Sequence, residues 1–246
     1  MNFLFQSGKY FLFLKQVITK PDRRKVFWSR CLDEMVSLGL NSMGIVAILS
    51  VFMGAVITLQ TASNIDSPLI PSYTVGYTTR QSIILEFAPT IISLILAGKI
   101  GSNIASEVGT MRVTEQIDAL EIMGVNSANY LVLPKVLAFM FIHPFLILFA
   151  MALGIIGGSA VVLGTGIISH VDYLEGVQLD FEAFTITYAL IKTVIFAFVI
   201  TSISGFYGYF ISGGALEVGK GSTKAVVSSS VLILVLNYLI TQLLLI

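Results

Sequence analysis

Long apolar runs without charged residues dominate the pattern along this chain. Three of them exceed the ~20 residues that a helix needs to cross a ~30 Å hydrocarbon core: 35–65, 136–171 and 225–246. Two further apolar runs of that length carry one or two isolated charges: 81–104 and 183–212. The pattern therefore predicts an all-α integral membrane protein with about five transmembrane helices. The run 136–171 is too long for one perpendicular helix, so we expect it to tilt or to project from the membrane.

A different pattern precedes the first span, where apolar residues recur at helical spacing among basic ones. Two amphipathic stretches flank Pro21 within residues 1–34, which are rich in aromatic side chains. Such stretches favour helices that lie in the membrane interface, attracted to anionic lipids by roughly 1 kcal/mol per basic residue. We therefore expect amphipathic interfacial helices at 1–34 and one membrane domain at 35–246. A disordered basic tail is the alternative for 1–34.

Residues 107–124 form a charged stretch between the second and third spans. Its charged residues are Glu107, Arg112, Glu115, Asp118 and Glu121. Because each ionised group at mid-bilayer costs ~3 kcal/mol on insertion scales, these charges exclude a membrane span. Gly109 and Gly124 suit helix ends, and the apolar residues between them recur at helical spacing. We expect one short amphipathic helix that presents its polar face to another protein.

Composition narrows the classes of function. Of the 246 residues, 56% are hydrophobic and 11% charged, whereas soluble domains have about 25% charged residues. A net charge of zero gives no basis for nucleic-acid binding, and the single cysteine, Cys31, excludes an internal disulfide and a cysteine metal cluster. The N-terminus lacks the features of a signal peptide. We expect no catalytic residue and no metal site in this chain.

The placement of lysine and arginine orients the chain. Seven of these residues precede residue 31, and five more lie in the connections between spans two and three and between spans four and five: Lys99, Arg112, Lys135, Lys220 and Lys224. Only Arg80 lies in a loop on the opposite side. By the positive-inside rule, the N-terminus and the 107–124 helix face the cytoplasm and the C-terminus faces outward.

Two short motifs have simpler explanations than catalysis. Residues 214–220 fit seven positions of a phosphate-binding loop, but Gly221 replaces the required Ser or Thr and no strand precedes them, so we expect a loop between spans. Ser159 with His170 could form a protease pair, and His143 lies within the third span. Neither histidine has a base or ligand partner at useful spacing, which favours packing or interfacial roles.

Small residues form two ridges along the predicted spans. Gly154 and Gly158 make the first, and Gly101, Ala105 and Gly109 make the second. Such ridges let helices approach closely. Intramolecular packing is the first interpretation and a homodimer seam is the second.

Glu86 and Lys192 are the two charges most firmly inside predicted spans. At ~1.5 Å per residue both lie within roughly 8 to 15 Å of the outer boundary, so they could pair between spans two and four. Ionisable groups at such depth usually mark a functional site because isolated charges are costly there. Two interpretations stay open: a structural ion pair, or a contact for an amphiphilic cargo, since the spans have too little polar lining for an aqueous solute.

A set of local motifs extends through residues 86–135. It comprises Glu86 with Pro89, Ala97-Gly98-Lys99 with Gly101-Ser102, Glu107 with Gly109 and Met111, Glu115-Gln116, Gly124, and Pro134-Lys135. With these motifs, and with 51–60, 191–197 and 213–227, the chain resembles the MlaE permease family, the membrane subunits of MCE-type ABC lipid transporters. It departs from the family pattern at Leu85, where a basic residue often precedes the glutamate.

The resemblance implies a homodimeric permease in a bacterial inner membrane that moves phospholipid-like lipids between the inner and outer membranes. Two cytoplasmic ABC ATPase subunits would bind ATP and Mg, an MCE-domain protein would lie outside, and this chain would hold no cofactor. Residues 107–124 would be the coupling helix, which contacts the ATPase through Glu107, Arg112, Glu115, Gln116, Asp118 and Glu121. Glu86, Leu85 and Lys192 would border the lipid cavity.

Two other classes of function remain as alternatives. One is an ATP-independent membrane channel or transporter whose polar helix packs on its own spans. The other is an intramembrane lipid-modifying enzyme, although histidines and paired carboxylates are scarce.

Overall fold

The computed structural model describes residues 3–19, 24–65 and 70–244, and the elements assigned within those ranges are all helical. Within these described ranges, five continuous helical rods are long and apolar enough to cross a membrane: Lys25–Asn64, Tyr73–Val113, Ser127–Thr165, Ala183–Tyr209 and Ala215–Leu244. The prediction of an all-α membrane protein with five spans is therefore confirmed. The third rod begins before the predicted residue 136 and ends where Gly166 takes a positive φ of 65°.

Two of the rods combine several helical segments. The first consists of α2 (Arg24–Glu34), the π-helical η1 (Met35–Leu40) and α3 (Asn41–Asn64). The second consists of α4 (Tyr73–Ser82), the π-helical η2 (Ile83–Ile91), α5 (Ile92–Leu96), the π-helical η3 (Ala97–Gly101) and α6 (Ser102–Val113). Pro89 lies inside η2 and lacks the N–H group that a regular helical bond requires, which favours a local departure from α geometry.

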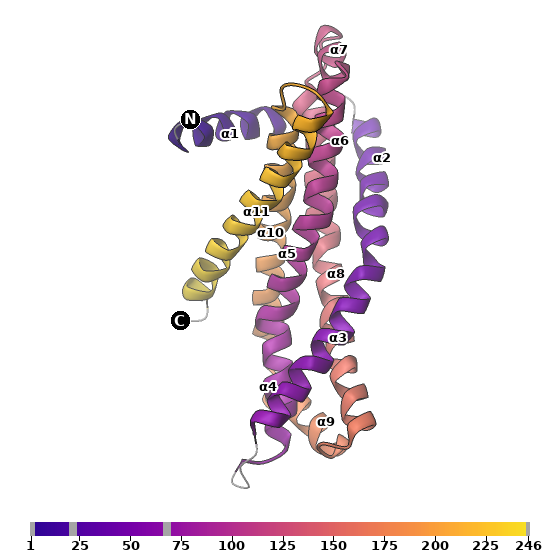
Figure 1. Ribbon diagram of the computed structural model, residues 1–246, viewed down its shortest axis with the longest axis vertical. Coiled ribbons are helices and arrows are strands. Elements are labelled where there is room, and N and C mark those ends of the chain that lie inside the picture. Colours follow the sequence, from indigo (N-terminus) through magenta and orange to yellow (C-terminus); the bar gives the residue numbers. More distant parts are fainter. Residues whose placement is uncertain (1–2, 20–23, 66–69, 245–246) are drawn as a thin grey trace.

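The remaining rods are α8 (Ser127–Thr165), α10 (Ala183–Tyr209) and α11 (Ala215–Leu244). In Figure 1 the rods run along the long axis of the molecule, except for α11, which slants away from the others toward the C-terminus. The short helix α7 (Gln116–Ile122) lies at one end of the long axis, and α9 (His170–Gln178) lies at the other. We refer to these as the α7 end and the α9 end.

The N-terminal region divides differently from the prediction. Helix α1 (Phe3–Val17) runs crosswise to the rods near the α7 end, as Figure 1 shows, and Tyr10 Oη lies 2.7 Å from Ser202 Oγ of α10. Its crosswise course agrees with a helix in the membrane interface, which stays a prediction. The second amphipathic stretch is not a separate helix, because α2 continues into the first rod and buries Cys31. Pro21 lies outside the described residues.

The predicted single helix at 107–124 is in fact two helices, so that prediction is wrong. Helix α6 carries its first part as the end of the second rod, and Glu115 then takes a left-handed conformation with a φ of 59° before α7 begins at Gln116. Gly109 lies within α6, whereas Gly124 follows α7 with a φ of 75°. Helix α7 alone therefore forms the tip in Figure 1.

Glycines allow the rods to pack closely within one copy of the chain. A β-carbon on Gly54 of α3 would meet the carbonyl oxygen of Gly154 of α8 at 1.8 Å. Side chains of α3 and α9 cover Gly158, and side chains of α10, α11 and the turn between them cover Gly101 and Gly109. Both predicted ridges therefore serve intramolecular packing, the first of the two interpretations.

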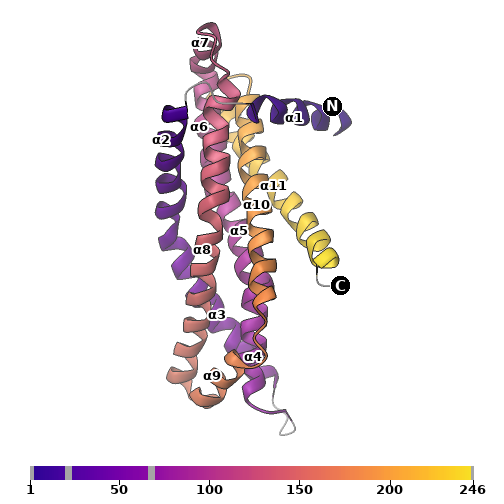
Figure 2. The same cartoon turned by 180° about the vertical axis from the view of Figure 1, so that it is seen from behind.

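The α9 end is held by a buried arginine. Arg80 of α4 donates hydrogen bonds to the carbonyl oxygens of Val177 at 2.9 Å and Leu179 at 2.6 Å. These carbonyls lie at the C-terminal end of α9, where the helix dipole favours a cation. Figure 2 shows α9 lying across the ends of α8 and α10, with α4 beside it. Arg80 is therefore part of the packing at this end rather than a loop residue in solvent.

Candidate functional site

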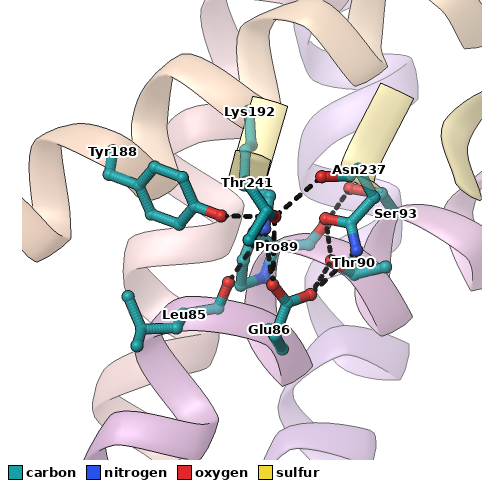
Figure 3. Close-up of polar contacts among 9 residues, drawn as sticks. All are labelled: Leu85, Glu86, Pro89, Thr90, Ser93, Tyr188, Lys192, Asn237 and Thr241. Atoms are coloured by element: carbon teal, nitrogen blue, oxygen red, sulfur yellow. Dashed lines mark hydrogen bonds and ion pairs between the residues drawn. The ribbon is translucent and has the colours of Figure 1, made fainter. Parts of the chain in front are cut away.

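An ion pair between η2 and α10 lies within the membrane-spanning rods, in the half nearer the α9 end. Lys192 Nζ lies 2.8 Å from Glu86 Oε1 and 3.2 Å from the carbonyl oxygen of Leu85. The Lys192 side chain is fully buried, whereas 42% of the Glu86 side chain is exposed. The structure thus brings together the two intramembrane charges that the sequence singles out (Figure 3). Of the two, only the carboxylate is exposed.

Neutral polar groups complete the surroundings of the Glu86 carboxylate. Asn237 Nδ2 donates to Glu86 Oε2 at 2.9 Å, and Thr90 Oγ1 lies 3.0 Å from that oxygen and from Asn237 Oδ1. Thr241 Oγ1 lies 3.5 Å from Oε1 and 2.7 Å from Tyr188 Oη. Figure 3 shows these groups converging from η2, α10 and α11. Both carboxylate oxygens therefore have partners on neighbouring helices.

Asn237 and Thr241 belong to the site although the charge pattern does not reveal them. Both are uncharged, and they lie in the last apolar run, which contains no charged residue. Their spacing of four residues puts them on one face of α11. A polar pair on a single face of the apolar C-terminal part of α11, after Val231, is the signal that could have identified them.

Leu85 contributes its backbone to the site. Its carbonyl oxygen accepts the hydrogen bond from Lys192. The Leu85 side chain points away from the Glu86 carboxylate in Figure 3. Any apolar lining from Leu85 would therefore lie beside the charged cluster rather than within it.

The two histidines have local partners. His143 is fully buried, with Nδ1 2.9 Å from the Thr193 carbonyl oxygen and Nε2 3.2 Å from Ser93 Oγ. Ser159 Oγ lies 2.9 Å from His170 Nε2, and no acidic side chain in the described ranges bonds to His170. His143 therefore fits the packing interpretation.

The stretch 214–220 does not form a phosphate-binding loop. Helix α11 begins at Ala215, so most of the stretch is helical. Lys220 pairs with Glu217, one turn earlier, at 2.6 Å. The lysine is thus engaged on the helix surface.

A second ion cluster lies near the α7 end. Lys135 of α8 is 4% exposed, and its Nζ lies 2.5 Å from Glu34 Oε1 of α2 and 2.8 Å from Glu107 Oε2 of α6. One lysine therefore ties three helices together. Glu107, a predicted ATPase contact, has an intramolecular partner here.

Three other predicted contact residues also bind within the chain. Arg112 Nη1 lies 2.7 Å from Asp118 Oδ1. Glu121 Oε1 accepts hydrogen bonds from Tyr209 Oη at 2.8 Å and Ser127 Oγ at 3.0 Å. These hydroxyls, Tyr209 first, hold the pKa of the Glu121 carboxyl below its usual range. Most of the polar side chains that we expected to face a partner therefore bond to other residues of this chain.

The rest of the α7 end is open. Gln116 Nε2 donates to Thr114 Oγ1 at 3.0 Å on the surface. The Glu115 side chain is exposed, and none of the described residues bonds to its carboxylate. Ile122 and Met123 are 87% and 68% exposed. An apolar tip therefore stands beside two polar residues that remain accessible, a feature that charge patterning alone does not predict.

Comparison with known proteins agrees with these observations. The protein family described as Permease MlaE matches residues 31–243. A probable ABC transporter permease protein of Rickettsia bellii is 36% identical over 236 residues, which cover 96% of this chain and 91% of that protein. The intermembrane phospholipid transport system permease protein MlaE of Haemophilus influenzae is 28% identical, over 94% of this chain and 88% of that protein. The chain therefore belongs to the MlaE permease family.

Proposed function

We propose that this chain is the permease subunit of an ABC transporter that moves phospholipid-like lipids between the inner and outer membranes of a bacterium. The relative from Haemophilus influenzae is named as a permease of intermembrane phospholipid transport. The observation that carries the proposal is the Glu86 carboxylate, held half-exposed at membrane depth beside the buried Lys192. The protein would lie in the inner membrane as a multi-pass subunit.

A lipid headgroup has the chemistry that suits this carboxylate. A charged side chain at the bilayer centre costs ~2.5–3.5 kcal/mol on insertion scales, so a half-exposed one is disfavoured unless something compensates it. Lys192 neutralises Glu86 from the buried side, and Asn237 holds its second oxygen. The exposed side of the carboxylate can then accept hydrogen bonds from a headgroup, while the apolar rods suit the acyl chains.

A second copy of the chain would complete the site. Only 11% of the most apolar stretch of α11 is buried within one copy. Beside the Asn237 face, α11 exposes Leu234 and Tyr238. A homodimer that packs along this face would shield Glu86 from lipid tails and enclose a cavity between the two copies.

The α7 end would contact the ABC ATPase subunits, which would bind ATP and Mg. Exposed apolar side chains in water favour a protein contact, and Ile122 and Met123 are such residues. Glu115 and Gln116 would supply polar contacts beside them. An outward-facing MCE-domain protein would meet the α9 end.

This arrangement requires a cytoplasmic α7 end, as the basic residues predict. A Met123→Cys variant should then react with a membrane-impermeant maleimide only from the cytoplasm, and Val171→Cys only from outside. The native Cys31 is buried and gives a low background. The reverse labelling pattern would overturn the orientation and the ATPase contact with it.

An ATP-independent channel or transporter is the second candidate. The ion pair Arg112–Asp118 and the bonds of Glu121 favour it, because they engage much of the polar face within the chain. The two candidates differ in their partners. Retention of an ABC ATPase by the tagged chain in mild detergent would support the proposal, and its loss with transport intact would support the second candidate.

The decisive experiment is a double-mutant comparison at the charged pair. Glu86→Gln and Lys192→Met each remove one charge at nearly constant volume. If the pair is only structural, each single change should destabilise the protein by up to about 3–5 kcal/mol, and the double change should largely restore stability. If Glu86 handles a headgroup, the double variant should assemble normally but should not recover transport.

Phospholipid transfer by the reconstituted complex and thermal unfolding should be measured on all three variants. Asp33→Asn is the matched control, because Asp33 is an exposed acid on α2, away from the charged pair and from both proposed partner contacts. It should leave both measurements unchanged. Normal transfer in every variant would eliminate the cargo role of the pair.

A further inference from the structure

A groove lies beneath the crosswise helix α1, near the α7 end and away from Glu86. It has a volume of about 600 Å³ and lies between α1, α10 and α11. Its walls are mostly apolar side chains, among them Phe11, Phe206, Val231 and Leu232. This volume falls within the ~300–1,000 Å³ of typical ligand pockets.

The hydroxyl groups in these walls are already paired. Tyr10 Oη lies 2.7 Å from Ser202 Oγ, and Ser228 Oγ donates to Tyr207 Oη at 3.0 Å. Burial raises the pKa of Tyr10, so its hydroxyl stays neutral. The groove therefore presents mainly apolar surface, which excludes a sugar or an ion as the occupant of its interior.

The basic residues of α1 lie outside the groove lining, and Lys9 is next in sequence to the lining residue Tyr10. Helix α1 carries Lys9 and Lys15 and no acidic residue. Lys9 Nζ lies 3.7 Å from the ring centroid of Phe210, which holds the ammonium group at the end of α10. The exposed Gln6 belongs to the lining on the same helix. An apolar interior with a cation beside it matches the two parts of an anionic amphiphile.

We propose that this groove binds one acyl chain of an anionic glycerophospholipid from the leaflet that contains α1, with the phosphate near Lys9 and Gln6. The occupant is a resident lipid that fastens α1 to α10 and α11. This inference does not depend on the transport proposal, because it uses none of the residues around Glu86. It depends on α1 lying at the membrane surface and on a second copy leaving the groove face of α11, with Val231, uncovered.

Tryptophan quenching tests the groove directly, because Trp28 is the only tryptophan in the chain. The full-length protein carrying Trp28→Phe and Phe11→Trp places a reporter on the groove wall. It is reconstituted with brominated phosphatidylglycerol or brominated phosphatidylcholine. We expect tighter quenching by phosphatidylglycerol by about fivefold, the effect of one basic residue near the surface.

Two matched variants assign this preference to the groove. Lys9→Gln should reduce it to near unity, whereas Lys15→Gln, six residues farther along the same helix and away from the lining residues Gln6 and Tyr10, should retain it. Val231→Phe should weaken quenching by both lipids because it fills the groove. Equal quenching by both lipids, unchanged by Lys9→Gln, would mean ordinary contact with bulk lipid and would overturn the proposal. Absence of quenching by either lipid would mean that protein covers the groove, and would overturn it as well.

Discussion

Lys192 and Lys135 are both almost completely buried, yet their surroundings differ. Lys192 meets one carboxylate, Glu86, whose other partners are neutral amide and hydroxyl groups. Lys135 meets two carboxylates, from Glu34 and Glu107, at 2.5 and 2.8 Å. The first cluster is electrically balanced, whereas the second has one negative charge in excess.

The difference shows how the same residue type can serve two purposes. A lysine shared by acids on α2 and α6 fixes three helices, and its removal leaves two like charges close together. A lysine paired with one half-exposed acid balances its charge and leaves one side of the carboxylate accessible to a further partner. The number and exposure of the partner carboxylates, rather than the burial of the lysine, separates a structural clamp from a candidate binding site.

The largest expected effect is the loss of stability on replacing Lys135, which joins α2, α6 and α8. Lys135→Met should lower the free energy of unfolding by up to about 3–5 kcal/mol, because it removes the buried cation that two partly exposed carboxylates share. Thermal unfolding of the purified protein in detergent measures this change. Lys99→Met is the matched control, since Lys99 is exposed and, among the described residues, its side chain bonds only to the Asn41 carbonyl oxygen. An equally small effect at both positions would abolish the distinction between the two clusters.

The next largest effect is expected around the Glu86–Lys192 pair. Asn237→Leu removes a hydrogen bond to a charged acceptor, an interaction worth about 1.5–3 kcal/mol. We expect a slower lipid transfer and a smaller loss of stability than for Lys135→Met. Gln242→Leu makes the same kind of change at an exposed position of α11 and should have little effect. Transfer that is unimpaired in Asn237→Leu would remove α11 from the site.

A smaller effect on stability is expected at the tip. Ile122→Ser should change the free energy of unfolding by no more than about 0.5 kcal/mol, because the side chain is exposed. It should nevertheless weaken ATPase binding, measured by co-purification. Ile117→Ser, in the buried face of the same helix, should lower stability clearly. Wild-type ATPase retention in Ile122→Ser would place the partner contact elsewhere.

The smallest expected effect is a loss of α7 stability at low pH. Glu121 has a lowered pKa in the folded state, so its bonds to Tyr209 and Ser127 stabilise α7 above the usual carboxyl range and are lost as pH falls through the folded pKa. Hydrogen exchange in α7, corrected for intrinsic rates, should accelerate in that range. In Glu121→Gln the corrected rates should not change with pH. A similar acceleration in both proteins would assign it to another group.

The sequence predicts the spans well because charge-free length is a local property. It also predicts Glu86 and Lys192, since a lone charge in an apolar run is conspicuous. The sequence does not single out Asn237, because membrane spans tolerate neutral amides. The sequence does not predict the role of Lys135, because its partners, Glu34 and Glu107, meet only after three helices have packed.

Helix boundaries are harder to predict for a related reason. The glycine pattern suggests helix ends at both Gly109 and Gly124, but Gly109 is needed for close packing within α6. The actual break is at Glu115, where a non-glycine residue takes a left-handed conformation. Basic residues at the start of α2 likewise hide its continuity with α3, because charge suggests a surface helix while the tertiary fold extends it.

The second rod has a geometric consequence that its length alone does not suggest. It runs unbroken from the α9 end, through η2 and η3, to α6 beside the tip. A π turn holds more residues than an α turn. Successive residues of an α-helix are about 100° apart around the helix axis. Rewinding either π segment into α geometry with its sequence unchanged would therefore shift the residues that follow it, including α6, by roughly a quarter of a revolution around the rod axis while the helix stays continuous. The two π segments therefore set the rotational position of α6 about the axis of this rod.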